Sequence, residues 1–191
     1  VVVTVEVSPG TTFADLAVCA LFVNPKIIPF MVMVLGRCLR TIDIKQYSMD
    51  HSEGFSVLEH CITRGVRIRL IFDRDKFWSP SCVRQNDRIR TLAEVASDEQ
   101  DSDELFQVRV LKPSVYGPGG FNSQHSKTWL LDVELYIDGS ANFTGQSTLN
   151  EESVLATRVQ SVVRDAAEVF DGVWARATPV PLCRLLTLPE H

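Results

Sequence analysis

The sequence predicts an α/β fold in which a mixed, largely parallel central sheet carries helices on both faces. The main observation is the order strand, helix, strand over residues 41–73, where the apolar runs TIDIKQY and VRIRLIFD enclose a helical pattern that ends at Gly65. Two strands joined in this way form the right-handed crossover unit of α/β proteins. The second observation is size, because 191 residues with 45% hydrophobic content can bury the core of one domain. We therefore expect a single domain over residues 1–191.

The stretch before the crossover unit is the most apolar part of the chain. A membrane-spanning helix needs about 20 uninterrupted apolar residues, and Pro25 and Pro29 break any single helix here. We therefore expect a core strand and a buried helix, although a role at a membrane surface stays open. The expected elements are a strand over 1–7, a short helix over 13–20 capped by Thr11 or Thr12, a strand over 20–23 and a helix over about 29–39.

The stretch after the crossover unit predicts an amphipathic helix and then a solvated acidic loop over 97–104. Its five acidic residues equal the whole formal net charge of −5, so the rest of the chain is neutral in sum. A strand over 105–112 and a Pro/Gly-rich loop over 113–124 follow. In that loop, Tyr116, Phe121 and Asn122 are candidates for substrate contact.

The end of the chain predicts one more strand, EESVLATR, and a long amphipathic helix over 159–177. The tail over 178–191 has no readable structure. The five cysteines are scattered singly, without C-x-x-C spacing, which is typical of free thiols in a reducing compartment. We therefore expect an intracellular location.

Polar residues at fixed spacing run from His125 to Asn142 in the pattern H-x-K-x4-D-x6-G-S-x-N. An imidazole can act as nucleophile or general acid near neutral pH, and the ammonium of Lys127 can stabilise phosphate oxygens. The apolar runs TWLL and VELYI predict strands, so side chains two apart share a face. On a straight strand Asp132 points away from the imidazole, which predicts that it anchors the motif.

This pattern resembles the HKD signature of the phospholipase D superfamily and matches it at every signature position. The following GSANFT and N-x-E, with Asn150 and Glu152, are similar to the branch that has one motif per chain. That branch includes small bacterial HKD endonucleases and the mitochondrial cardiolipin hydrolases (Zucchini). The resemblance implies a phospholipase D-like fold, with phosphodiester hydrolysis through a phosphohistidine and with neither a metal nor a cofactor.

The resemblance also implies which residues form the site. The catalytic residues are His125, Lys127, Asp132 and Glu152, and the groups that bind the substrate phosphate are Lys127, Gly139, Ser140 and Asn142. The reaction needs two histidines and the chain has one H-x-K, so a homodimer that shares one active site is implied. Glu152 is expected to hold the imidazole tautomer.

The residues leave the substrate open. The first hypothesis is a phospholipid, as for mitochondrial cardiolipin hydrolase, which implies the mitochondrial outer membrane and a membrane-surface association. The second is single-stranded RNA or DNA, which favours a basic groove; the pI of about 5.4 argues weakly against it. Local patches of Arg64, Arg67, Arg69 and Lys112 are candidates to line such a groove. The third is a non-catalytic scaffold on the same fold.

Overall fold

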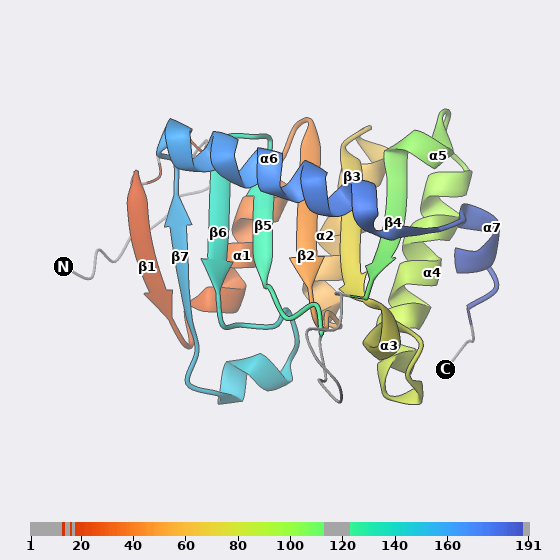
Figure 1. The fold of residues 1–191 in the computed structure, drawn as a ribbon, viewed down its shortest axis with the longest axis horizontal. Helices are drawn as coiled ribbons and strands as arrows, with labels where there is room; N and C mark the ends of the chain where they lie inside the picture. Colours follow the sequence, from red (N-terminus) through yellow and green to blue (C-terminus); the bar gives the residue numbers. More distant parts are fainter. Residues whose placement is uncertain (1–12, 14–15, 17, 113–122, 189–191) are drawn as a thin grey trace.

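The computed structural model describes residues 13, 16, 18–112 and 123–188, and one eight-stranded sheet organises them. The strand order is β1-β7-β6-β5-β2-β3-β4-β8, with helices on both faces (Figure 1). The expected mixed sheet is therefore confirmed. The expected strand over 1–7, with Thr11 and Thr12, and the loop residues Tyr116, Phe121 and Asn122 lie outside the described residues.

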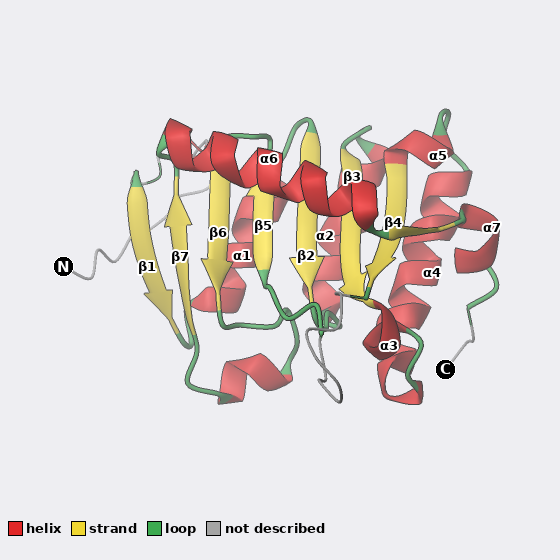
Figure 2. Ribbon diagram, in the orientation of Figure 1, coloured by secondary structure: helices red, strands yellow, loops and turns green. Residues whose placement is uncertain are grey.

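Figure 2 shows how helices and strands alternate along the chain. The strands are β1 (Cys19–Val23), β2 (Thr41–Gln46), β3 (Arg67–Asp73), β4 (Phe106–Leu111), β5 (Thr128–Leu131), β6 (Leu135–Gly139), β7 (Ser153–Thr157) and β8 (Thr178–Val180). The helices are α1 (Ile27–Gly36), α2 (Ser52–Thr63), α3 (Arg74–Phe77), α4 (Val83–Ser97), α5 (Ser102–Leu105), α6 (Gln160–Arg176) and α7 (Leu182–Leu185), with the 3-10 turns η2 (Pro80–Cys82) and η3 (Gln146–Leu149). Among the described helices, none is both long and apolar enough to cross a membrane.

The expectation of a largely parallel sheet is wrong. Only the β2–β3 and β3–β4 pairs are parallel, and the other five pairs are antiparallel. The physical reason is the length of the connections. A parallel pair needs a crossover of a dozen or more residues, whereas the short turn between β5 and β6 permits only antiparallel pairing.

Three further expectations differ from the structure. Cys19 and Ala20 begin β1 instead of ending a helix, because β1 pairs with β7 along its whole length. The acidic stretch contains the short helix α5. The tail is ordered where β8 pairs with β4 and α7 follows, since this strand covers an otherwise open edge of the sheet.

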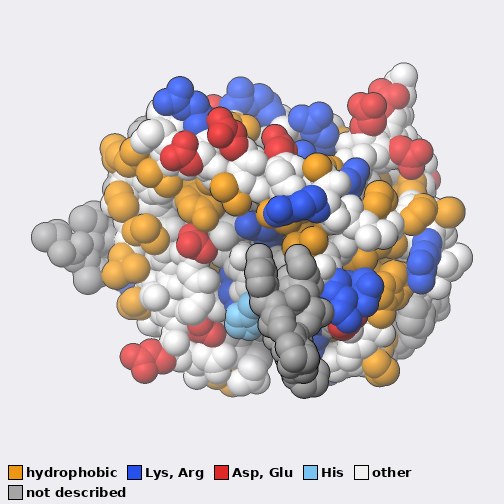
Figure 3. Space-filling model, in the orientation of Figure 1, with side chains coloured by type: hydrophobic (Ala, Val, Ile, Leu, Met, Phe, Trp, Pro, Cys, Tyr) orange, Lys and Arg blue, Asp and Glu red, His pale blue; other side chains and the backbone are white. Residues whose placement is uncertain are grey.

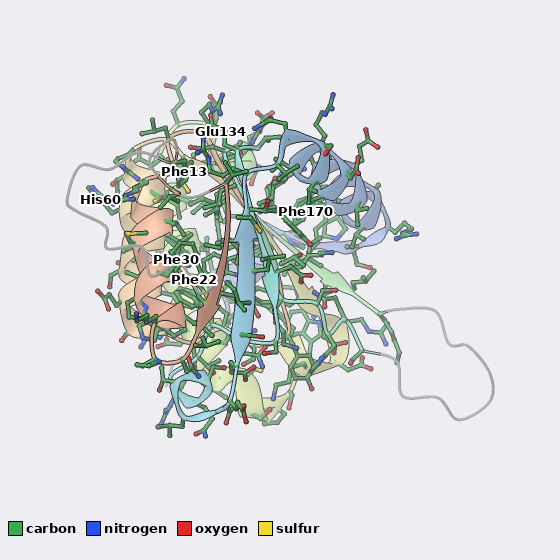
Figure 4. All side chains as sticks on the ribbon, turned by 90° about the vertical axis from the view of Figure 1, so that its left-hand side faces the viewer. Phe13, Phe22, Phe30, His60, Glu134 and Phe170 are labelled. Atoms are coloured by element: carbon green, nitrogen blue, oxygen red, sulfur yellow. The ribbon has the colours of Figure 1, made fainter. Side chains whose placement is uncertain are left out.

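The two faces of the sheet are covered unequally. Helices α1, α2 and α4 lie behind the sheet in Figure 1, and α6 alone crosses the front face. The view from the side shows the same division, with Phe22 and Phe30 on the α1 side and Phe170 under α6 (Figure 4). The rings of Phe22 and Phe30 stack at 3.8 Å between centroids. Most of the apolar core therefore lies between the sheet and the three helices behind it.

Candidate active site

All motif residues except Asp132 lie at one edge of the sheet, where the parallel strands have their carboxyl ends. Thr128, the first residue of β5, pairs with Lys45 near the end of β2 and with Asp138 near the end of β6. Gly139 pairs in turn with Val154 at the start of β7. The segments that precede β5 and β7 and those that follow β2, β3 and β6 therefore meet at the lower edge in Figure 1.

The side chains of His125 and Lys127 converge at this edge. The Nζ of Lys127 lies 2.9 Å from Nδ1 and 3.1 Å from Nε2 of the imidazole, and it donates to the carbonyl oxygen of His125 at 2.7 Å. His125 is exposed, whereas Lys127 is only 5% exposed. Both residues precede β5 instead of lying on it. An anion that reaches the exposed imidazole therefore also meets a buried ammonium.

Burial lowers the pKa values of both His125 and Lys127. Burial is the largest cause that lowers the pKa of His125, the charge of Lys127 lowers it further, and the carboxylate of Asp73 opposes both. Burial also lowers the pKa of Lys127, against the charge of Glu152. The neutral imidazole is therefore favoured at pH 7, and its free lone pair is what a nucleophile requires.

The segment after β6 brings Gly139, Ser140 and Glu152 together. Only glycine fits at 139, because a Cβ there would lie 2.2 Å from the carbonyl oxygen of Ser153. The Ser140 hydroxyl donates to Oε2 of Glu152, and the Asn150 amide donates to Oε1 at 3.2 Å. The hydrogen bonds of Glu152 within the described chain thus go to these two side chains and not to the imidazole of its own chain.

Asn142 stands apart from this network. Its Oδ1 is buried and accepts no hydrogen bond from the described residues. The next residue, Phe143, fixes the segment, because its carbonyl oxygen accepts from the backbone N–H groups of Asp50 and His51 at 3.0 and 3.1 Å. Its ring also packs against Gly54, where no side chain would fit. The backbone contacts of Phe143 therefore position Asn142, whose side-chain oxygen remains available as an acceptor.

Asp132 lies at the opposite end of β5 from His125. Its carboxylate accepts hydrogen bonds from the backbone N–H groups of Leu39, Arg40 and Thr41 at 2.8 to 2.9 Å. Its own φ is +53°, a left-handed conformation that aspartate tolerates better than most residues. Asp132 thus ties the β5–β6 turn to the start of β2 and has no described contact with the imidazole.

Three residues of this edge were not singled out from the sequence. The Tyr47 ring lies 5.0 Å from the His125 ring between centroids, and the Nζ of Lys76 lies 5.7 Å from the Tyr47 centroid. The carboxylate of Asp73 accepts from the backbone N–H groups of Gln124 and Lys76, both at 2.8 Å. Their positions in the sequence could have indicated them, because Tyr47 directly follows β2 and Asp73 ends the neighbouring parallel strand β3.

The arginines proposed for a substrate groove do not reach this edge. Arg69 binds Asp43 at 2.6 Å and Asp171 at 2.9 Å under α6. Arg64 donates to the carbonyl oxygen of Cys38 behind the sheet, and Arg67 begins β3 at the far edge. Lys112 is near α3, but it binds Asp75 at 3.0 Å. The expectation of a groove lined by these four residues is therefore wrong.

Comparisons with known proteins agree with this architecture. Residues 31–174 match the family described as "Cardiolipin synthase, PLD-like domain". The chain is 26% identical over 141 residues to the mitochondrial cardiolipin hydrolase of Chlamydomonas reinhardtii, which covers 73% of this chain and 54% of that protein. The chain therefore spans about half the length of this curated relative.

Two solved structures share the fold over nearly their whole length. NucT from Helicobacter pylori aligns with a TM-score of 0.68 at 16% identity, over 85% of this chain and 98% of that one. Nuc from Salmonella typhimurium, a phospholipase D family member, aligns with a TM-score of 0.66 at 17% identity over the same shares. At sequence identities this low, the similarity shows a shared fold and says nothing about a shared substrate.

Proposed function

The chain belongs to the cardiolipin synthase PLD-like domain family, and from this premise and the geometry of the site we propose that it hydrolyses phosphodiester bonds through a phosphohistidine on His125. This family confirms the resemblance to the phospholipase D superfamily. One observation carries the proposal: the ammonium of Lys127 lies within 3.1 Å of both ring nitrogens of an exposed imidazole. A phosphate placed against that imidazole is bound and activated by the same contact.

The reaction has two displacements at phosphorus. A ring nitrogen of neutral His125 attacks phosphorus and forms a P–N bond while the P–O bond to the leaving alcohol breaks. A second imidazole, in its protonated form, gives its proton to the leaving oxygen. Water then attacks phosphorus, gives its proton back to that second imidazole, and releases His125. Lys127, together with Ser140 and the Asn142 amide, stabilises the charge on the non-bridging oxygens.

The second imidazole is proposed to come from His125 of a second copy in a homodimer. The face that α6 crosses is the surface we assign to this contact, because no other described helix covers it. Figure 3 shows hydrophobic side chains on this face and a histidine on its lower half. The exposed apolar side chains of this region are Leu21, Val23, Leu155, Val162 and Val169. Each carboxylate oxygen of Glu152 accepts one hydrogen bond within its own chain and can accept a second, which in such a dimer would come from the imidazole of the partner.

A phospholipid is the substrate that we propose first. The support is the curated relative, a cardiolipin hydrolase, and a hollow beside Glu152 that is lined by Val23, Asn24 and Leu149. Leu149 is 79% exposed, so an apolar surface adjoins the polar site. An amphipathic substrate fits this arrangement, and attachment to a membrane surface, mitochondrial as in the relative, follows from it.

Single-stranded nucleic acid is the second candidate. The observation that favours it is the alternation of aromatic rings and cations beside the site, which single-strand binding proteins use for bases and phosphates. Lys76 lies over Tyr47 and Arg184 lies over Trp78, at 5.7 and 4.2 Å from the ring centroids. The two substrates are separated by incubating the protein in EDTA with labelled oligonucleotides or with phospholipid vesicles.

Replacement of the nucleophile tests the proposal. His125→Asn is expected to lower kcat/KM for bis(p-nitrophenyl) phosphate at least about a thousandfold, since the covalent step is lost. His60→Asn is the matched control, because His60 is exposed on α2 away from the site. Unchanged turnover in His125→Asn would overturn the proposal. It would also be overturned if the active protein sedimented as a monomer. Absence of turnover by the folded, unmodified protein on every phosphodiester favours the scaffold hypothesis.

A further inference from the structure

Tyr47, which directly follows β2, lies close to two ammonium groups. Its ring centroid is 5.8 Å from the Nζ of Lys127 and 5.7 Å from the Nζ of Lys76. The two nitrogens are therefore at most 11.5 Å apart, because 5.8 and 5.7 Å add to that limit. The His125 ring lies 5.0 Å from the same Tyr47 ring. Lys76 is thus near the reacting pair, and the Tyr47 ring contacts both.

Lys76 differs from the other cations around α3. Arg74 and Lys112 both bind the carboxylate of Asp75, at 3.1 and 3.0 Å. The Nζ of Lys76 instead donates to the Ser81 hydroxyl at 2.9 Å, and in the part of the chain that the structure describes no carboxylate forms an ion pair with it. Its charge is therefore held in place by a neutral group.

The residues around Lys76 provide donors, and the acids nearest to it along the chain already have partners. The hydroxyls of Ser79 and Ser81 lie 2.9 Å apart, next to the ammonium. Asp75 is the nearest acid along the chain, but its oxygens bind Arg74 and Lys112. The oxygens of Asp73 accept from two backbone N–H groups. Two ammonium groups near one ring repel each other, and a bound anion relieves that repulsion.

We propose that Lys76, Ser81 and Tyr47 form a subsite for a second phosphate group on the substrate, next to the phosphodiester that is cleaved at His125. The inference rests on the proposed function, because the second phosphate is defined relative to the first. Lys76 supplies the charge, Ser81 and Ser79 supply O–H donors, and Tyr47 lies next to both phosphate positions. Both a glycerolipid with two phosphates and an oligonucleotide carry this chemistry.

A matched pair of small substrates tests the subsite. The p-nitrophenyl ester of glycerol phosphate is compared with the same ester that carries a further phosphate on the far hydroxyl. We expect the unmodified protein to prefer the second substrate about tenfold in kcat/KM, the effect of one charge-assisted contact. Lys76→Met should bring this ratio close to one, and Lys76→Arg should retain most of it. A ratio near one in the unmodified protein would overturn the subsite.

Lys112→Met is the control for a general loss of positive charge. It removes a lysine from the same side of α3, where Asp75 keeps its contact with Arg74. The ratio should stay at its original value in this variant. An equal loss in Lys112→Met and Lys76→Met would overturn the proposal in favour of a long-range charge effect.

A binding measurement separates failure of the subsite from failure of the proposed function. Glycerol 1,3-bisphosphate and glycerol 1-phosphate are titrated calorimetrically into the unmodified protein and into Lys76→Met, which needs no turnover. Tighter binding of the bisphosphate that depends on Lys76 supports the subsite even where no ester is cleaved, and its absence overturns it. Two further series then identify whether the second phosphate belongs to a lipid or to a nucleic acid. One compares vesicles with one-phosphate or two-phosphate lipids, and the other compares dinucleotides with or without a terminal phosphate. A preference dependent on Lys76 in either series supports the subsite, and none in both overturns it.

Discussion

The cations at the two ends of the central strands differ in how they are paired with carboxylates. At the upper edge in Figure 1, charged groups are paired: Arg69 binds Asp43 and Asp171, and Arg40 binds Glu134. At the lower edge, where most of the motif lies, Arg74 and Lys112 bind Asp75, but Lys127 and Lys76 form no described ion pair. Buried charge without a partner is costly in a stable protein. The unpaired ammonium groups at the lower edge therefore lower the stability of the free protein, and a bound anionic substrate would offset this cost. The ion pairs at the upper edge stabilise the fold.

The largest effect that this comparison predicts is on catalysis at the lower edge. Lys127→Met should lower kcat/KM by about a thousandfold, roughly 4 kcal/mol in the barrier, because the ammonium that stabilises the phosphate oxygens is lost. The free energy of unfolding should stay the same or rise, since burial disfavours this ammonium. Steady-state kinetics and urea unfolding measure the two quantities.

The control for this prediction is Lys26→Met, at an exposed lysine before α1. It should change neither kinetics nor unfolding. A large loss of stability in Lys127→Met would show that this cation supports the fold, and the contrast between the two edges would then be lost.

The second prediction removes an anchor of the upper edge. Asp132→Ala should lower the free energy of unfolding by about 3 kcal/mol, because three backbone N–H groups lose their acceptor and alanine is strained at a φ of +53°. Asp98→Ala, at an exposed aspartate after α4, should lie within about 0.5 kcal/mol of the unmodified protein. Turnover of folded Asp132→Ala should be retained, and a loss of kcat without loss of structure would make Asp132 a catalytic residue.

The third prediction concerns the ion pair beneath α6. Arg69→Met should destabilise the protein by about 2 kcal/mol, since Asp43 is only 3% exposed and would keep its charge without a partner. The double variant with Asp43→Leu should recover most of that loss, because no buried charge then remains. Urea unfolding of the two variants measures the coupling, and additive losses would contradict a pairing role.

The proximity of His125 and Lys127 could be predicted from the sequence because the two residues are close along the chain. His125 and Lys127 are two residues apart, so any extended backbone brings their side chains to one side, even though neither lies on β5 as expected. Tyr47 and Lys76 could not be found in this way, because they join the site only through the order of β2 and β3 in the sheet. Pairing order is a property of the whole fold and not of a local pattern.

The errors in the sheet have the same origin. The crossover unit was visible as a local pattern, and it was extended to a largely parallel sheet that five of the seven strand pairs contradict. The strand β8 was missed because TPV has no alternation of its own. Pairing with β4 makes these residues a strand, and a sequence of three residues does not specify that pairing.

The smallest expected effect is on the pH dependence. The pKa of His125 is lowered by burial and by Lys127, so the acid limb of kcat/KM should lie below pH 6.5, with about a tenfold fall per unit below the pKa of the nucleophile. Asp73→Asn removes the charge that opposes these shifts and should move the limb to still lower pH. Stability follows the same sign: the unfolded imidazole binds a proton more readily, so stability present above pH 6.5 is lost as pH falls toward the lowered pKa. A limb above pH 6.5 would mean that a carboxylate, and not the unpaired ammonium, governs the imidazole, and the lower edge would then resemble the upper one.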